Sequence, residues 1–271
     1  MNFSYRTAAI KSSDNFGRWS DKKTSEEKVV ALAGNPNVGK STVFNSLTGL
    51  RQHTGNWPGK TVSNACGQYC FRGRNYTIVD IPGTYSLLAN SAEEEIARDF
   101  ICFGNPDAVV VVADSTCLER NLYLLLQILE ITDRVGLCVN LMDEAKKKKI
   151  DINLELLSLK LGIPVVGTSA RSGKGLNRLL EAVASVTQEP PKNDPLKVSY
   201  GTTIEKAVSM IEPCLESCLG GRISGRWIAL KLLEGDDGVL MALNKYLCLD
   251  ISGNNNVWQS ARRARNFLFE N

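Results

Sequence analysis

The octapeptide GNPNVGKS at residues 34–41 constrains the fold of this chain more than any other feature. It directly follows the β-branched run Val29–Ala33 and opens an amphipathic segment that we predict to be a helix. In such a strand–loop–helix, glycines let backbone N–H groups converge on a phosphate at a helix N-terminus. We expect Lys40 to neutralise the β- and γ-phosphates and Ser41 to bind Mg²⁺. The predicted phosphate contacts are Gly34, Asn35, Pro36, Asn37, Val38, Gly39, Lys40, Ser41, Thr42 and Gly83.

Short apolar runs alternate with longer amphipathic segments from residue 28 to residue 186. This alternation predicts strand–helix–strand crossovers, and therefore a mainly parallel sheet with helices on both faces. Predicted strands cover 29–33, 65–71, 76–80, 108–113, 135–140 and 164–167, and predicted helices cover 40–48, 92–103, 118–132, 153–161 and 176–186. The second and third strands flank a turn at 72–75, so we expect one antiparallel hairpin in the sheet.

The chain divides into four predicted parts. Residues 1–27 are polar and aperiodic and are expected to form a poorly ordered arm, followed by a nucleotide-binding domain over 28–187. Three prolines indicate a linker over 188–199. A small all-α domain follows over 200–271, with helices predicted at 203–218, 225–233, 238–247 and 256–269.

The composition argues against several classes of protein. The chain is 43% hydrophobic and 23% charged, as soluble globular proteins are, and its longest apolar runs are too short to cross a bilayer. The net charge of +3 offers no bulk attraction for nucleic acid. A single histidine beside eight cysteines makes no recognisable zinc pattern.

Further polar motifs stand at the predicted carboxyl ends of later strands, where open α/β sheets bind ligands. DIPG at 80–83 offers Asp80 to Mg²⁺ through water and the Gly83 N–H to a γ-phosphate, which makes it the second switch segment: Asp80, Ile81, Pro82 and Gly83. In NLMD at 140–143, the Asp143 carboxylate can accept both donors of a guanine edge, a pair that adenine lacks. The predicted guanine-binding residues are Asn140, Asp143, Thr168, Ser169 and Ala170, the last three through backbone N–H groups facing the guanine oxygen. The sequence therefore predicts a Ras-like P-loop GTPase domain with GTP as its substrate.

Two departures from the usual GTPase pattern affect kinetics. Leu141 stands where a lysine usually packs along the base, which predicts modest affinity and fast GDP release. Thr84 and Tyr85 stand where a water-orienting glutamine is common, so we expect slow intrinsic hydrolysis.

The segment between the first helix and the second strand narrows the family. Its predicted first switch comprises Gly55, Asn56, Trp57, Pro58, Gly59, Lys60, Thr61 and Val62, with Thr61 as a Mg²⁺ ligand. Trp57 is either an anchor that docks elsewhere or a locally packed side chain. The string GNWPGKT, together with GNPN, DIPGTYSL and RWIALKLLEGD at 226–236, resembles the cytosolic region of the FeoB ferrous-iron transporters, over about residues 28–269.

This resemblance implies a GTPase that regulates or drives a membrane Fe²⁺ pathway, with a helical domain that acts like a GDP-dissociation inhibitor. It also implies K⁺-stimulated hydrolysis, with the cation held by Asn37 and by backbone carbonyls near Gly55 and Trp57. We expect a soluble piece of a longer integral membrane protein, at the cytoplasmic face of the cell membrane. Its expected partners are GTP and GDP, the transporter's own membrane domain, small cytosolic accessory proteins and a second copy of the chain.

The alternative is a soluble ribosome-assembly or RNA-modification GTPase. Such proteins usually add a basic RNA-binding module. The appended helical segment here has mixed charge and lacks both a GxxG clamp and the aromatic motifs of RNA-binding sheets, so nucleic acid is not an expected partner.

Overall fold

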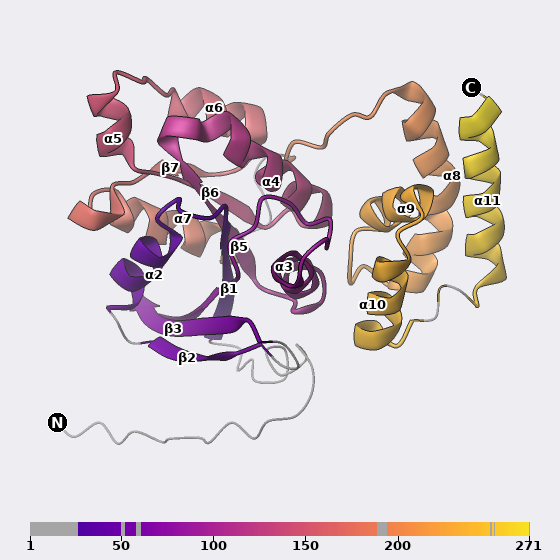
Figure 1. The fold of residues 1–271 in the computed structure, drawn as a ribbon, viewed down its shortest axis with the longest axis horizontal. Coiled ribbons are helices and arrows are strands. Elements are labelled where there is room, and N and C mark those ends of the chain that lie inside the picture. Colours follow the sequence, from indigo (N-terminus) through magenta and orange to yellow (C-terminus); the bar gives the residue numbers. More distant parts are fainter. Residues whose placement is uncertain are drawn as a thin grey trace.

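The computed structural model describes residues 27–49, 52–57, 61–188, 194–249, 251 and 253–270. The arm predicted over 1–27 lies outside the described residues except for Glu27, which begins the first strand. The described chain forms a sheet covered by helices and, beside it, a separate group of helices (Figure 1).

A seven-stranded sheet of order β2-β3-β4-β1-β5-β6-β7 organises the first unit. Its strands are β1 (Glu27–Gly34), β2 (Gln52–Asn56), β3 (Ser63–Phe71), β4 (Arg74–Asp80), β5 (Ala108–Asp114), β6 (Val135–Asn140) and β7 (Val165–Gly167). β1 pairs in parallel with β4 and β5, and the parallel pairing continues through β6 to β7. β3 is antiparallel to β4, which confirms the predicted hairpin.

Strand β2 corrects the sequence prediction, which gave no strand to residues 52–56 and placed Gly55 and Asn56 in the first switch. This stretch, QHTGN, pairs antiparallel with β3 and forms one edge of the sheet. Its residues show no apolar alternation. Main-chain hydrogen bonds to β3 hold the strand in place instead. The pattern of side chains therefore does not predict this strand.

Helices cover both faces of the sheet. α2 (Lys40–Thr48) and α7 (Leu176–Gln188) pack on one face, against the even-numbered β1 residues Val30 and Leu32. α3 (Ala92–Phe103) and α4 (Leu118–Ile131) pack on the other face. The remaining elements are short: η1 (Ser115–Cys117), α5 (Met142–Lys147), α6 (Leu154–Leu161) and η2 (Ala170–Ser172). The layers are those of the predicted Ras-like α/β fold.

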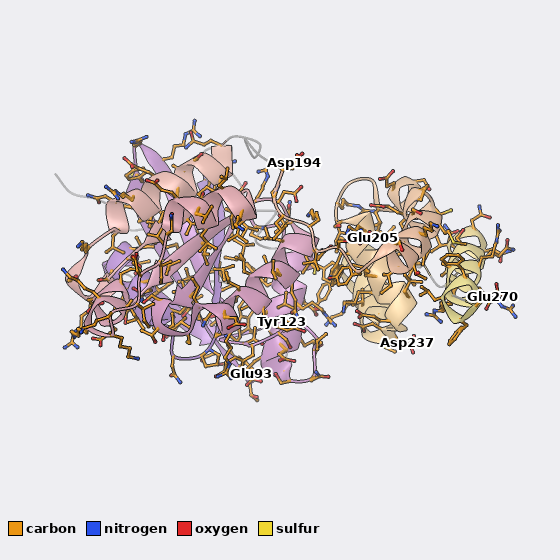
Figure 2. The ribbon with its side chains drawn as sticks, turned by 90° about the horizontal axis from the view of Figure 1, so that it is seen from above. Glu93, Tyr123, Asp194, Glu205, Asp237 and Glu270 are labelled. Atoms are coloured by element: carbon orange, nitrogen blue, oxygen red, sulfur yellow. The ribbon has the colours of Figure 1, made fainter. Side chains whose placement is uncertain are left out.

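The second unit consists of α8 (Thr202–Leu219), α9 (Gly225–Glu234), α10 (Asp237–Leu247) and α11 (Asn255–Glu270), all close to their predicted bounds. α8 packs against α9 and α11, while α9 contacts α4 and α10 contacts α3. Figure 2 shows this unit beside the first, with Glu205 near the junction and Glu270 at the far end. One apolar cluster runs from the α3–α4 face of the sheet into the helical unit, so the two units share a core.

Within the described residues, no helix is both long enough and apolar enough to cross a membrane.

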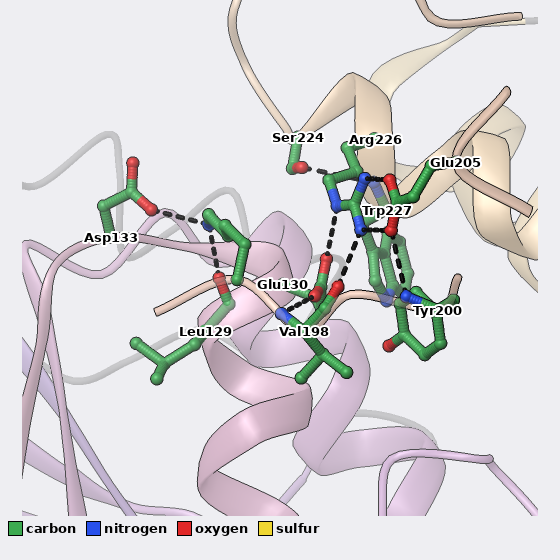
Figure 3. Close-up of polar contacts among 10 residues, drawn as sticks. Leu129, Glu130, Asp133, Val198, Tyr200, Glu205, Ser224, Arg226 and Trp227 are labelled. Carbon is green, nitrogen blue, oxygen red and sulfur yellow. Dashed lines mark hydrogen bonds and ion pairs between the residues drawn. The ribbon is translucent and has the colours of Figure 1, made fainter. Parts of the chain in front are cut away.

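A polar network fastens the helical unit to the end of α4 (Figure 3). The Glu130 carboxylate, 4% exposed, accepts hydrogen bonds from Arg226 Nε at 3.1 Å and from the Val198 N–H at 3.1 Å. The same guanidinium donates to both Glu205 oxygens at 2.6 and 2.9 Å. Lys197 Nζ donates to the Leu129 carbonyl at 2.5 Å, so residues 197–198 of the predicted linker are fixed against α4.

Arg226 sets the charge state of this network. The hydrogen bonds from its guanidinium lower the pKa of the Glu205 carboxyl to about 2, so Glu205 stays charged in acid where a free glutamate is protonated. Glu130 is buried and depends on Arg226 and Val198 for its compensation. Removing one partner from such a group costs more than the pair itself contributes.

We expect Arg226→Ala to lower the free energy of unfolding by roughly 3 kcal/mol, because Glu130 would remain buried without its cation. Arg72→Ala is a matched control: its ion pair with Glu181 is 68% and 54% exposed, and such pairs contribute less than about 1 kcal/mol. Urea unfolding of the two variants tests the difference. Equal losses would show that the network contributes nothing beyond a surface pair.

Candidate functional site

The octapeptide loop joins β1 to α2 at the carboxyl edge of the sheet, as predicted. Gly39 precedes α2 with a φ of 81°, a left-handed conformation that favours glycine. A Cβ added there would lie 2.5 Å from Asn140 Nδ2. The loop therefore needs glycine at position 39 for its backbone conformation and for the close approach of Asn140.

Asn140 joins the phosphate loop to the last of the predicted base-reading segments. Its Nδ2 donates to the Val38 carbonyl at 3.1 Å, and its Oδ1 accepts from Thr168 Oγ1 at 3.0 Å and from the Ala170 N–H at 3.1 Å. The residue is 1% exposed. We predicted that Asn140 contacts the base, and the structure gives its side chain a further role as a tie between two loops.

Lys40 and Asp80 form an ion pair inside the site. Lys40 Nζ bonds to Asp80 Oδ1 and donates to the Ile81 carbonyl at 2.7 Å. Burial raises the pKa of the Asp80 carboxyl, and the Lys40 ammonium opposes that rise. The two groups predicted to serve phosphate and Mg²⁺ thus neutralise each other here, and a nucleotide with its metal would have to exchange these bonds.

The second switch segment lies directly against the phosphate loop. The Thr84 N–H donates to the Gly34 carbonyl at 3.2 Å. A Cβ added to Gly83 would lie 3.4 Å from the Cα and N atoms of Pro36. Asp80 and Gly83 therefore both contact the phosphate loop, through Lys40 and Pro36, and their contacts with Mg²⁺ and the γ-phosphate stay predictions.

The start of α3 organises the chain that follows the second switch. Glu94 accepts hydrogen bonds from Ser86 Oγ and from the Asn90 N–H, each at 2.9 Å, and Ser91 caps the helix. We did not assign Glu94 a role in the site. Its only sequence signal was a run of acidic residues, which a favourable interaction with the helix dipole already explains.

The base-reading segments lie together at the ends of β6 and β7. The Asp143 side chain is exposed, and the Asp143 N–H donates to Ser169 Oγ at 3.1 Å. The N–H groups of Thr168, Ser169 and Ala170 donate to Val139 O, Lys174 O and Asn140 Oδ1. Contact between these N–H groups and a guanine oxygen, as we predicted, would share or replace those bonds.

Leu141 occupies the edge of this region with a φ of 62°, and its carbonyl accepts from Ser115 Oγ at 2.8 Å. Ser115 was not among the predicted site residues. It directly follows β5, so the rule that ligand-binding residues follow parallel strands could have found it. Its hydroxyl helps to fix the loop that carries Asp143.

The beginning of the first switch belongs to the edge strand of the sheet. Gly55 and Asn56 belong to β2, and the Trp57 N–H donates to the Val62 carbonyl at 2.8 Å. Thr61 is exposed in a bend before β3. Pro58, Gly59 and Lys60 lie outside the described residues.

Trp57, which the sequence left as either a docking anchor or a locally packed side chain, is packed locally in this conformation. Its side chain is 2% exposed and makes an edge-to-face contact with Phe100 of α3, with ring centroids 5.4 Å apart. It belongs to the same apolar cluster as α3 and α4. In this conformation Trp57 anchors the first switch in the core of the domain.

Two sets of residues are predicted to hold cations, one for Mg²⁺ and one for K⁺. Ser41, Thr61 and Asp80 supply hydroxyl and carboxylate oxygens, the ligands that Mg²⁺ prefers. Asn37 is exposed, with a φ of 67°. Gly55 belongs to β2 at the edge of the sheet, three strands away from β1.

Two family models match the chain. "Ferrous iron transport protein B" covers residues 28–183, and "FeoB cytosolic helical domain" covers residues 200–266. The Fe(2+) transporter FeoB of Salmonella typhimurium is 38% identical over 214 residues, which are 76% of this chain and 27% of that protein. The chain thus spans about a quarter of the length of this relative.

Solved structures give the same result. The cytosolic domain of the T. maritima FeoB iron transporter in its apo form matches with a TM-score of 0.72 and 36% identity, over 90% of this chain and 97% of that chain. A mutant of S. thermophilus NFeoB bound to mGDP matches with a TM-score of 0.74 and 33% identity, over 90% of this chain and 91% of that chain. Both similarities include the sheet and the appended helices.

Replacing Asn140 and Asp143 by alanine should have different effects on stability and on base selectivity. Asn140→Ala leaves the Val38 carbonyl and the Ala170 N–H buried without their partner, so we expect the free energy of unfolding to fall by about 3 kcal/mol. Asp143→Ala, at an exposed position, should change it by less than about 0.5 kcal/mol but reduce the preference for guanine over adenine at least about tenfold. Thermal unfolding and calorimetric titration with GDP and ADP measure both. Unchanged selectivity in Asp143→Ala would contradict the guanine assignment.

Trp57→Ala should lower the free energy of unfolding of the nucleotide-free protein by about 3 kcal/mol, because a buried indole is lost from a packed core. Tyr123→Ala is the control, since Tyr123 is 57% exposed. A double-mutant cycle of Trp57 with Phe100 should give a coupling of about 1 kcal/mol. A loss below about 0.5 kcal/mol for Trp57→Ala would show that the first switch is not anchored in solution.

Proposed function

The chain belongs to the ferrous iron transport protein B family, and we propose that it is the part of a membrane Fe²⁺-uptake transporter that binds GTP and hydrolyses it to GDP and phosphate. The observation that carries this proposal is the meeting of four separate segments at one edge of the sheet. They are the phosphate loop, the Asp80–Gly83 segment, the Asn140–Asp143 segment and the Thr168–Ala170 segment. The described residues contain no group of three or more histidine, cysteine and carboxylate side chains suited to hold iron, so Fe²⁺ would be cargo handled elsewhere in the longer protein.

Binding would begin with an exchange of partners. Lys40 would leave Asp80 and the Ile81 carbonyl for the β- and γ-phosphates, and the freed Asp80 carboxylate would then join Ser41 and Thr61 around Mg²⁺, through water in the case of Asp80. Bound Mg²⁺ would neutralise phosphate charge and orient the β- and γ-oxygens. The Asp143 carboxylate would select guanine by accepting both donors of its edge.

Hydrolysis would depend on positioning more than on a dedicated base. Thr84 and Tyr85 follow Gly83, and Thr84 Oγ1 is bonded within its own turn to the Ser86 carbonyl at 2.6 Å. This supports a slow intrinsic rate. Charge that develops between the β- and γ-phosphates would be stabilised by Lys40 and by a K⁺ ion held beside Asn37.

The contacts of α3 support a relay from the switches to the helical unit. Glu94 at its start holds Ser86, which closely follows the second switch, Phe100 packs on Trp57 of the first switch, and Phe103 stacks on Tyr246 of α10 with centroids 5.1 Å apart. Movement of either switch would therefore act on a helix that contacts the helical domain. The membrane domain of the longer protein, at whose cytoplasmic face this part would lie, is the proposed receiver of that signal, alongside small cytosolic accessory proteins and a second copy of the chain as further partners.

The second family model argues against the RNA-associated alternative. It assigns the helices over 200–266 to a domain of the ferrous-iron transport family. The proposed function therefore accounts for both units of the chain.

A hydrolysis assay that varies the nucleotide and the monovalent cation together tests this proposal. We expect GTP to be hydrolysed and ATP not, and the rate in KCl to exceed that in NaCl at least about tenfold, as expected for a preorganised positive charge at the β–γ bridge. Asn37→Ala should remove the K⁺ stimulation while GDP binding changes less than about twofold. Equal rates with ATP would overturn the GTPase assignment, whereas equal rates in the two salts would overturn only the role of K⁺.

A further inference from the structure

Asn35 presents an unusual feature of the phosphate loop. Its side chain is 3% exposed, and neither its Nδ2 nor its Oδ1 has a hydrogen-bond partner among the described residues. Asn140, an equally buried amide in the same site, uses both of its polar atoms. A buried amide without partners destabilises the conformation that contains it, so its presence needs an explanation.

The chain on either side of Asn35 is in contact with the second switch. The Gly34 carbonyl accepts from the Thr84 N–H at 3.2 Å, and Pro36 lies within van der Waals distance of Gly83. Thr84 is itself 4% exposed. The main chain of residues 83–84 thus lies against both neighbours of the unpaired amide.

Nucleotide binding would release this part of the second switch. Lys40 now holds its beginning through Asp80 and the Ile81 carbonyl, and these are the bonds that Lys40 would exchange for phosphate. Once they are exchanged, the peptide groups between Pro82 and Thr84 can shift while Gly83 turns its N–H toward the γ-phosphate. The main chain of residues 82–84 offers carbonyl acceptors and the Thr84 N–H donor, which match the donor and acceptor functions of an asparagine amide.

We infer that Asn35 is a positioning residue: with GTP bound, its amide hydrogen-bonds the main chain of residues 82–84 and holds the Gly83 N–H at the γ-phosphate. This rests on the proposed GTPase function. The amide is unsatisfied in the conformation described here because its partner is the switch in its other position. A buried water that bridges the amide in every state is the competing explanation.

Replacing Asn35 by leucine, which has the same branching without polar atoms, separates the two explanations. If Asn35 awaits the second switch, Asn35→Leu raises the melting temperature of the nucleotide-free protein by about 2–4 °C, because an unsatisfied amide is removed. The same variant lowers kcat for GTP about tenfold while the Kd for GDP changes less than about twofold. A water-bridged amide predicts the opposite sign for the melting temperature.

Two further variants control for changes in packing and for the loss of any buried polar group. Asn35→Ala removes the amide without adding volume, and it should lower kcat to the same extent even if leucine disturbs the packing. Thr187→Val removes another buried polar group, the hydroxyl that bonds helix carbonyls in α7, and should leave kcat unchanged.

Hydrogen exchange of the amides of residues 83–86 with a non-hydrolysable GTP analogue gives a direct readout. The unaltered protein should gain protection there on binding, and both Asn35 variants should lose that gain. Full kcat in both variants, or a lower melting temperature for nucleotide-free Asn35→Leu and Asn35→Ala alike, would overturn the inference. If the unaltered chain fails to hydrolyse GTP, the proposed function fails instead, and the exchange experiment still decides the role of Asn35.

Discussion

The side chain of Asn140 joins loops that are far apart in the sequence, reaching Val38 across 102 residues and Ala170 across 30. It is buried, and each of its two polar atoms is in use. A second contact supports this link, because Ser46 Oγ of α2 donates to the Ala170 carbonyl at 3.2 Å. The Asn140 amide therefore helps to set the distance between the phosphate subsite and the base subsite, and its close approach requires glycine at position 39.

Three other features of the site have opposite effects on the stability of its present conformation. Lys40 pairs with Asp80, Trp57 draws the first switch into the core, and the Asn35 amide is buried without a partner among the described residues. The first two contacts stabilise the present conformation, while the third opposes it. A nucleotide that supplies phosphate charge would reverse this balance, and such opposed terms are what a two-state switch requires.

The helical unit is attached in a way that suits a relay. Its apolar core is continuous with the α3–α4 face of the sheet, so it is not a freely tethered domain. The buried Glu130 and its partner Arg226 fix α9 and the preceding segment to the end of α4. The contact through Phe103 and Tyr246 instead lies on α3, the helix that follows the second switch. One attachment thus lies at the end of α4, and the other lies on the helix that follows the second switch.

The sequence by itself determined the local chemistry: the phosphate loop, the order of the motifs at strand ends, the sheet with its hairpin, and the helices. These follow from contiguous patterns, because a glycine loop or an apolar period needs only its own neighbours. Tertiary structure decided what depends on distant partners. Strand β2 is held by main-chain pairing that no side-chain pattern records, Trp57 is buried because Phe100 lies opposite it, and Lys40 meets Asp80 across 40 residues. Whether a polar group such as Asn35 is satisfied depends on every segment that packs around it, and only the folded chain brings those segments together.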